Sequence, residues 1–203
     1  MLYKMGGSIL PVTFHNNQIY FLFGKERDND ENPGWSDFGG GTEKGESFIN
    51  TAIREGSEEL TGFLGSPKDI KQLLNKYGTY HVDYNSQGHT TYRVHIFPME
   101  YDDKLIFYYN NNQRFLQKKL DPKIIEDQKI FEKTEIKWFT FEELKNKKHI
   151  FRSFYQNIVP LFLNQKTQIT SFIQSNLKKR SASKSGKKKT RKTRKTRKTK
   201  KIN

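Results

Sequence analysis

The stretch from Gly39 to Gly62 constrains the fold of this chain more than any other part of its sequence. Its apolar residues recur with helical periodicity from Ser47 to Leu60. On a helix of about 100° per residue with Glu55 at zero, one set of residues falls between about 20° and 160° and forms an apolar face. The set comprises Phe48, Ile49, Ala52, Ile53, Gly56, Leu60 and Phe63. Because Glu58 falls near 300° and Glu59 near 40°, three carboxylates lie along one edge of that face.

This arrangement of carboxylates is unfavourable for an ordinary helix. Like charges three and four residues apart repel each other, and acids near a helix C-terminus oppose the macrodipole. Gly56, in the middle of the apolar face, costs about 1 kcal/mol relative to alanine. A divalent cation would relieve several of these costs, and oxygen ligands select a hard ion such as Mg²⁺ or Mn²⁺. The alternative is a solvated acidic face on which Arg54 pairs with Glu58, since Glu-x-x-Glu-Glu is common on helices.

The stretch resembles the signature of the Nudix hydrolases, G-x5-E-x7-R-E-U-x-E-E-x-G-U, in which U is a bulky apolar residue. The first glycine and all five charged positions agree, and they are occupied by Gly40, Glu46, Arg54, Glu55, Glu58 and Glu59. The order of the flanking strands and the segment from Glu135 to Leu144 are also similar to the family, so most of residues 5–163 fit it. The resemblance therefore implies an enzyme that hydrolyses a diphosphate linkage, a Nudix-type pyrophosphohydrolase.

Four positions depart from the family pattern. Gly56 stands where a bulky apolar residue is usual, and Phe38 stands where proline often precedes the glycine pair. Thr61 occupies the second glycine position and Gly62 the final apolar position. These changes concern helix packing and the exit turn more than the chemistry, and we expect the left-handed turn to move to Gly62.

The resemblance also implies a role for each matching residue. Glu55 and Glu59 resemble the metal ligands, Glu58 lies near the metals, and the carbonyl of Gly40 resembles a backbone ligand for Mg²⁺ or Mn²⁺. Arg54 and Glu46 resemble supports that orient the glutamates. The general base varies within the family. Here it is Glu58 or an acid before the late strand, where Glu132 is favoured over Glu135 and Asp127. The predicted catalytic set is Arg54, Glu55, Glu58 and Glu132.

The rest of the core reads as a mixture of strands and helices. Strands are expected over Ser8–Phe14 and Gln18–Gly24, over Thr79–Tyr84 and Thr90–Met99 as a hairpin, and over Glu135–Phe141. Residues 102–128 are ambiguous, and 150–177 are expected to be helical and bent or split at Pro160. This mixture favours an α/β fold, which the resemblance specifies as a Nudix-type α/β/α sandwich with a mixed sheet.

Charge divides the chain into two parts. Residues 178–203 carry 15 of the 37 Lys and Arg residues and no acid, which leaves 22 basic and 22 acidic residues in 1–177. We expect a neutral Nudix domain over 1–177 and a disordered basic tail over 178–203. The tail lacks the regularly spaced apolar residues that would stabilise an ordered structure. The tail repeats Arg-Lys-Thr at a period of three, and its predicted nucleic-acid contacts are Arg191, Lys192, Arg194, Lys195, Arg197 and Lys198.

The tail is equally well interpreted as a nuclear or nucleolar address, or as a segment that only increases solubility. No cysteine is present, which excludes disulfides and thiolate chemistry, and no apolar run approaches the length of a membrane helix. We therefore expect no membrane contact and an intracellular, soluble protein of the cytoplasm or nucleus. The oligomeric state is left open.

Three functions remain at this stage. The first is hydrolysis of capped RNA held by the tail. The Asn- and Lys-rich composition and the basic tail resemble those of Nudix proteins of large DNA viruses, some of which remove mRNA caps. The second is hydrolysis of nucleotides, dinucleoside polyphosphates or diphosphoinositol polyphosphates, with a targeting tail. The third is a non-catalytic nucleic-acid-binding protein on the same scaffold, against which the intact Glu55, Glu58 and Glu59 argue.

Overall fold

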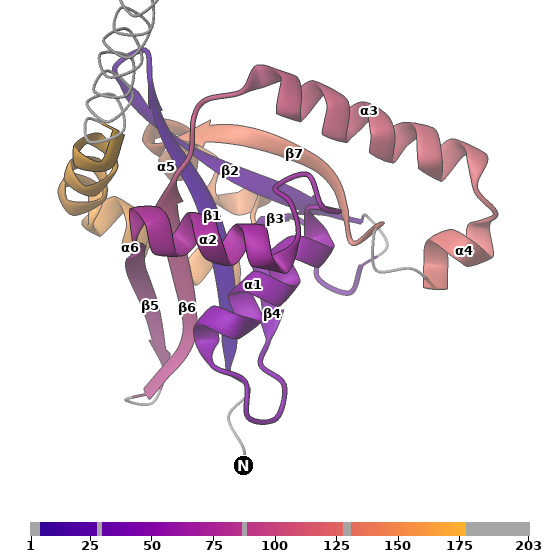
Figure 1. The fold of residues 1–203 in the computed structure, drawn as a ribbon, viewed down its shortest axis with the longest axis horizontal. Coiled ribbons are helices and arrows are strands. Elements are labelled where there is room, and N and C mark those ends of the chain that lie inside the picture. Colours follow the sequence, from indigo (N-terminus) through magenta and orange to yellow (C-terminus); the bar gives the residue numbers. More distant parts are fainter. Residues whose placement is uncertain (1–4, 28–29, 87–88, 128–130, 178–203) are drawn as a thin grey trace, which may run out of the picture.

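The computed structural model describes residues 5–27, 30–86, 89–127 and 131–177, and Figure 1 shows their fold. A seven-stranded sheet forms the middle layer, with the strand order β3-β2-β1-β6-β5, and β4 and β7 pair with β1 and β2. The strands are β1 (Gly6–His15), β2 (Gln18–Glu26), β3 (Trp35–Ser36), β4 (Phe38–Gly41), β5 (Tyr80–Ser86), β6 (His89–Pro98) and β7 (Lys133–Thr140). Because β1 pairs with β6 in parallel and with β2 and β4 antiparallel, the sheet is mixed as predicted.

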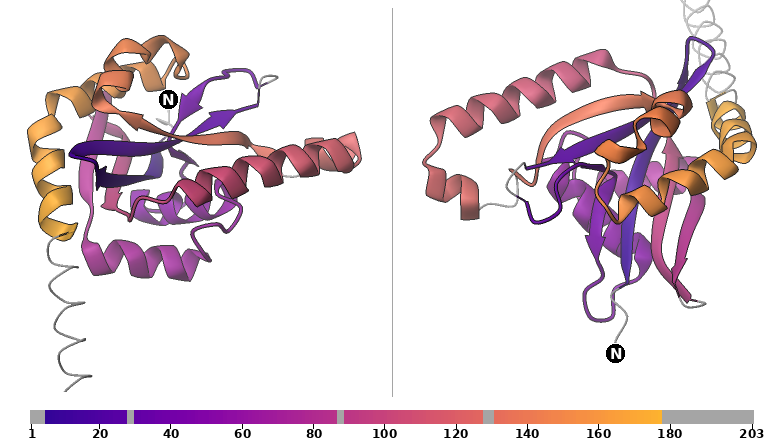
Figure 2. Two further views of the ribbon diagram at one scale, coloured as in Figure 1. Left: turned by 90° about the horizontal axis from the view of Figure 1, so that it is seen from above. Right: turned by 180° about the vertical axis from the view of Figure 1, so that it is seen from behind.

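Helices cover both faces of the sheet (Figure 1, Figure 2). They are α1 (Phe48–Glu59), α2 (Pro67–Tyr77), α3 (Asp103–Lys119), α4 (Pro122–Asp127), α5 (Phe141–Asn146) and α6 (Val159–Asn164), followed by a helical segment over 166–177. The residues of α1, α2 and α3 share one apolar core with the sheet, while α5, α6 and 166–177 share the other. The predicted α/β/α sandwich is therefore confirmed.

The central strands supply both cores by alternation. In β2, Phe21 and Phe23 face the core beneath α5 and α6, whereas Leu22 faces the core beneath α1. Successive side chains of a strand point to opposite faces, so a strand covered on both sides is a continuous apolar run. In β1, Ile9 and Leu10 divide between the two cores in the same way. This double burial fixes β1 and β2, and with them the strand β4 that leads into α1.

Several expected boundaries differ from those observed. The helix α2 was not expected, although Ser66 caps it through a reciprocal capping box with Asp69. The ambiguous stretch contains α3 and α4, with Asp102 capping α3. The helical region over 150–177 is split rather than bent, and Pro160 lies in the first turn of α6, where its missing N–H costs nothing. The predicted tail lies outside the described residues, and no helix within them is both long and apolar enough to span a membrane.

Candidate active site

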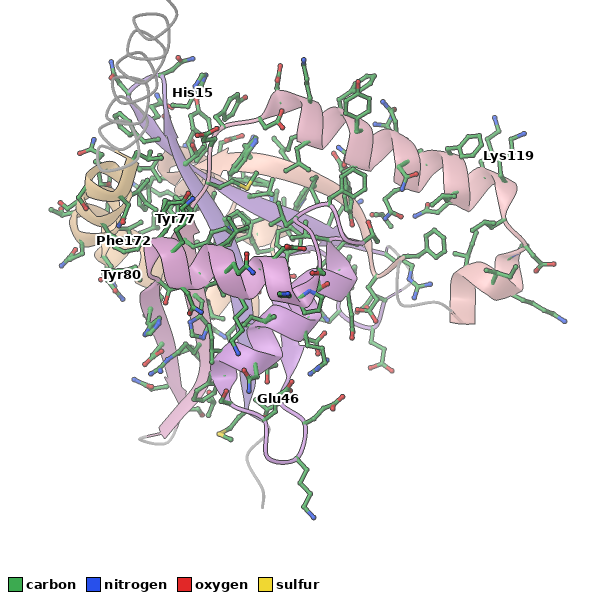
Figure 3. All side chains as sticks on the ribbon, viewed as in Figure 1. His15, Glu46, Tyr77, Tyr80, Lys119 and Phe172 are labelled. Atoms are coloured by element: carbon green, nitrogen blue, oxygen red, sulfur yellow. The ribbon has the colours of Figure 1, made fainter. Side chains whose placement is uncertain are left out.

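The loop between β4 and α1 is fixed by the guanidinium of Arg54. Its Nε and Nη2 donate to the two carboxylate oxygens of Glu46 at 3.1 and 3.0 Å, and Nη2 also donates to the carbonyl of Gly41 at 3.2 Å. The hydrogen bonds from Arg54 lower the pKa of the Glu46 carboxyl to about 2, so this pair is charged at neutral pH. Figure 3 shows Glu46 beside the loop that precedes α1. Arg54 therefore connects the loop, β4 and the helix.

The same guanidinium also orients Glu55. Nη1 of Arg54 donates to Oε1 of Glu55 at 2.7 Å, whereas Oε2 of Glu58 lies 3.9 Å from Nη1. The carboxylate of Glu55 is directed at β4, where a Cβ on Gly40 would lie only 2.5 Å from Oε1 of Glu55. The position therefore requires glycine, because any side chain at residue 40 would displace the carboxylate from the backbone of β4.

Glu59 occupies the buried end of the same row of carboxylates. Glu59 is 4% exposed. Its Oε2 accepts a hydrogen bond from the N–H of Gly39 at 2.8 Å, and its Oε1 lies 3.2 Å from Nζ of Lys133. Burial raises the pKa of the Glu59 carboxyl well above its usual value, and the negative charges of Glu26 and Glu132 act in the same direction. Glu55 and Glu59 thus both converge on the backbone of residues 39–40.

A buried charge network, defined here as Glu26, Lys133 and Glu59, lies behind the helix. Lys133 is fully buried and its ammonium contacts Glu26, Glu59 and the hydroxyl of Ser36, the last at 2.7 Å. Burial alone lowers the pKa of Lys133, but the carboxylates of Glu59 and Glu26 outweigh it and raise the pKa. Sequence reasoning missed Glu26 and Lys133, which no local spacing connects to the motif.

The glycine departures within α1 and after its end lie in different environments. Gly56 is buried against β1, and a Cβ at this position would collide with the side chain of Ile9, so α1 lies close to the sheet. The expectation that the left-handed turn moves to Gly62 is only half right, because Thr61 (φ 48°) and Gly62 (φ 75°) are both left-handed. The close approach of α1 brings Glu55 and Glu59 against β4.

A cavity of about 320 Å³ opens beside the glycines of β4. Its lining includes Gly39, Gly40 and Gly41, together with Asp37, Tyr92, Arg152, Phe154 and Tyr155. Asp37 is buried, accepts hydrogen bonds from Ser8 and, at 2.9 Å, from the hydroxyl of Tyr92, and burial raises its pKa to about 6. Phe154 is 40% exposed and makes edge-on contacts with the rings of Tyr84 and Tyr92. The cavity therefore combines an aromatic wall, in which the rings meet edge to face, with polar groups.

The candidates for a general base lie at different depths. The side chain of Glu58 is 34% exposed and is the most accessible of the three helix glutamates. Glu132 is half-buried, and its charge acts on the carboxyl of Glu59. Glu135 is exposed on β7, and Asp127 ends α4. Glu58 and Glu132 are therefore the candidates with an observed link to the site, through Arg54 and Glu59 respectively.

The donor set suits a hard divalent cation. Within the described residues no ready-made group of three or more His, Cys, Asp or Glu side chains has the geometry to hold a metal. The repulsion among Glu55, Glu59, Glu26 and Glu132 is nevertheless a feature that an added cation would relieve. The oxygens of Glu55, Glu58 and Glu59 and the backbone at Gly40 are of the kind that Mg²⁺ and Mn²⁺ prefer.

In the comparison with protein-family models, residues 8–162 match the NUDIX domain. Since this match covers well over half of the chain, the chain belongs to the NUDIX family. The prediction of a Nudix-type pyrophosphohydrolase is confirmed at this level, and divalent metals are general in the family. A comparison with curated protein sequences finds no significant match.

Solved structures with a similar fold include Nudix proteins from several organisms. A C. elegans Ap4A hydrolase binary complex is 15% identical, with 81% of this chain and 98% of that chain covered and a TM-score of 0.45. The Nudix hydrolase RenU from M. smegmatis is 12% identical, with 82% and 88% covered and a TM-score of 0.48. A NUDIX hydrolase from Nitrosomonas europaea is 19% identical, with 81% and 89% covered and a TM-score of 0.39.

Proposed function

We propose that this chain hydrolyses a diphosphate linkage in a nucleoside-containing substrate, with Mg²⁺ or Mn²⁺ held by the carbonyl of Gly40 and by Glu55, Glu58 and Glu59. The observation that carries the proposal is the convergence of Glu55 and Glu59 on residues 39–40, at the edge of the cavity. When bound, the cation would neutralise charge on the phosphate oxygens and lower the pKa of the attacking water.

The chain's own residues then have distinct roles. Arg54 and Glu46 are positioning residues, because they hold Glu55 and the β4–α1 loop and do not face the cavity. Gly40 lets the Glu55 carboxylate approach the backbone. Glu58 or Glu132 accepts the proton of the attacking water. Of the two, Glu58 is the more exposed helix residue and Glu132 precedes the buried Lys133.

The cavity suits the nucleoside part of the substrate. Its aromatic wall at Phe154 and Tyr92 offers a face on which a base stacks, and Asp37 and Arg152 offer polar partners. Trp35 and Phe23 do not take this role, since both are buried in the core. We therefore expect Phe154→Ala to raise KM for the nucleotide more than it lowers kcat.

The first test is product analysis of the full chain with Mg²⁺ or Mn²⁺ on cap-labelled RNA and on a panel of free nucleotides and dinucleotides. Glu59→Gln is compared with Glu142→Gln, which changes an exposed acid on α5. Loss of turnover by at least a hundredfold in Glu59→Gln alone supports the proposal. No turnover on this panel or on diphosphoinositol polyphosphates would favour the non-catalytic binding protein.

Capped RNA is the finer substrate that we propose, with the tail residues Arg191, Lys192, Arg194, Lys195, Arg197 and Lys198 contacting the polynucleotide. Support comes from the charge distribution alone, since 15 cations without an acid follow a neutral domain. Deleting residues 178–203 should weaken capped-RNA cleavage in a salt-dependent way and leave free-nucleotide turnover unchanged. If the deletion changes neither RNA binding nor cleavage, the tail is a targeting segment, as in the small-molecule alternative.

A further inference from the structure

Helix α3 carries an unusual outer face. It projects from the body of the molecule on the α1 side of the sheet (Figure 1, Figure 2). Its side chains at Phe107, Tyr108 and Phe115 are 62%, 60% and 60% exposed, the highest values for large hydrophobic side chains among the described residues. Exposed aromatic rings that gather on one element indicate a contact surface, because single scattered apolar residues are the norm.

Cations are interleaved with these rings. Lys104, Arg114, Lys118 and Lys119 are all exposed, and no acid occurs between Lys104 and Leu120. At about 100° per residue, the rings and the cations fall within about 140° of the helix circumference. We call this set of seven residues the α3 stripe; Figure 3 labels Lys119 at its far end. The stripe spans about 22 Å along the helix axis from its first to its last cation.

The opposite face of α3 is firmly packed. The hydroxyl of Tyr109 donates to the carbonyl of Glu59 at 2.8 Å, and the side chain of Asn110 exchanges two hydrogen bonds with the backbone of Ile136 on β7. Because buried polar contacts of this kind fix both the rotation and the position of a helix, the stripe has to face solvent. The exposed rings are therefore not a core that has failed to pack.

We propose that the α3 stripe binds single-stranded nucleic acid, with the rings stacking on unpaired bases and the cations contacting phosphates. A stripe of four cations without an acid complements a polyanion, and interleaved aromatic and basic side chains are how proteins hold single strands without reading their sequence. A protein partner fits less well, because lysine is depleted in the centre of protein interfaces. A lipid surface fits less well, because interfacial helices separate their apolar and basic faces.

The test compares a single strand with a duplex, because only unpaired bases are expected to stack on the rings of the α3 stripe. This comparison distinguishes binding by the stripe from binding by any other cationic segment of the full chain. Fluorescence anisotropy measures binding of a labelled unstructured 12-nucleotide RNA and of the blunt duplex of the same length, in EDTA. The variant Phe107→Gln/Tyr108→Gln/Phe115→Gln should bind the single strand at least tenfold more weakly and the duplex within twofold of the native chain. Circular dichroism and Tm confirm that each variant is folded.

A second pair of variants tests the charges. Arg114→Gln/Lys118→Gln/Lys119→Gln should reduce the magnitude of the slope of log K against log salt for the single strand by about 2. Each phosphate contact contributes about 0.7 to that slope. The matched control Lys68→Gln/Lys71→Gln/Lys76→Gln removes three exposed cations from α2 and should leave the slope unchanged. Equal slopes for the two triple variants would overturn the phosphate contacts.

Replacing the three rings by leucine separates stacking from apolar docking. Phe107→Leu/Tyr108→Leu/Phe115→Leu keeps an apolar surface but removes the planar faces, so it should also lose the preference for the single strand. Retention of that preference, or a loss of single-strand and duplex binding to the same extent, would overturn the proposal. Ring-dependent binding to anionic vesicles with unchanged RNA binding would overturn it in favour of a lipid surface. None of these outcomes depends on the proposed hydrolysis, since no turnover is measured.

Discussion

The two ends of the site, at Glu46 and Glu59, place the same side chain in opposite environments. Glu46 lies at the start of α1 beside the guanidinium of Arg54, and its pKa is lowered to about 2. Glu59 lies at the buried end of α1, and burial raises its pKa despite the ammonium of Lys133. The comparison shows that hydrogen bonds from a cation outweigh burial at the outer end, whereas burial outweighs the nearby cation at the inner end.

Lys133→Met should have the largest effect, because it changes the inner end of the site and leaves the outer end intact. It removes the ammonium that Glu26 and Glu59 share, 3% and 4% exposed; Glu26 keeps the guanidinium of Arg152 at 2.7 Å, whereas Glu59 loses the cation that it contacts. We expect the free energy of unfolding in EDTA to fall by about 3–5 kcal/mol, the usual cost of breaking a buried ion pair. Urea denaturation measures the loss. Lys137→Met, on the same strand with a side chain 44% exposed, is the control and should change stability by about 0.5 kcal/mol or less.

Adding Mg²⁺ tests whether the inner end accepts a cation. At about 100 times its Kd, a ligand that binds only the folded state raises the free energy of unfolding by about 2.7 kcal/mol. We expect this increase in the native chain and in Glu142→Gln, and its loss in Glu59→Gln. Equal stabilisation of all three proteins by Mg²⁺ would show that Glu59 is not a ligand.

The pH dependence in EDTA gives an independent check of the same residue. Because the folded-state pKa of Glu59 is raised, its contribution to stability is complete below its usual pKa of 4.5 and is lost as the pH rises towards the folded value. The stability of Glu59→Gln relative to the native chain should therefore increase between pH 5 and pH 8. A constant difference across this window would contradict the raised pKa.

The outer end of the site was predictable from sequence and the inner end was not. Glu46, Arg54 and Glu55 lie within ten residues, so a helix and one loop bring them together without any tertiary information. Lys133 contacts Glu26 across 107 residues of sequence, and neither residue follows a spacing that marks it. Their contact depends on the pairing of β2 with β7, which periodicity alone does not specify.

The fold shows the same division between local and long-range information. Because β1 and β2 are buried on both faces, they are continuous apolar runs that the sequence predicts as strands. The capping residue before α1 likewise predicts a helix. The capping box of Ser66 and Asp69 was also local and identifies α2 once it is considered. By contrast, α3 carries aromatic residues and three consecutive asparagines that favour other structures, and its packing on β7 through Asn110 decides the outcome.

Glu46→Gln tests the outer end and should have a smaller effect than the changes at Lys133 and Glu59. The amide keeps the shape but removes the charge that holds Arg54, so we expect the Mg²⁺ concentration at half-maximal activity to rise about tenfold, as for other residues that orient metal ligands. Glu46→Asp should restore part of this affinity. An unchanged Mg²⁺ dependence would show that Glu46 does not position Glu55.

The pH dependence of that variant has the opposite sign to that of Glu59→Gln. The pKa of Glu46 is lowered, so its contribution to stability is present above its usual pKa of 4.5 and is lost as the pH falls towards about 2. The stability difference between the native chain and Glu46→Gln should therefore stay constant above pH 5 and shrink below it. Denaturant titrations at pH 7, 5 and 3.5 measure this difference.

The smallest effect is expected at the exit of α1, where the chain is left-handed at Thr61 and Gly62. Thr61 has a φ of 48°, where a β-branched residue costs about 1–2 kcal/mol, and its buried hydroxyl has no hydrogen-bond partner among the described residues. Thr61→Gly removes this strain but adds about 0.4–1 kcal/mol of unfolded-state entropy. We therefore expect a net gain of about 0.5–1 kcal/mol in urea denaturation.

Gly62→Ala is the matched change one residue later, where φ is 75° and an added Cβ meets no other atom. Only the backbone strain of the left-handed conformation then acts, and the variant should lose about 1 kcal/mol. Because both changes leave Arg54 and Lys133 in place, the opposite pKa shifts of Glu46 and Glu59 should survive in both. A loss of stability in Thr61→Gly would mean that the packing of the threonine methyl group outweighs the strain, and that the helix exit depends on this side chain.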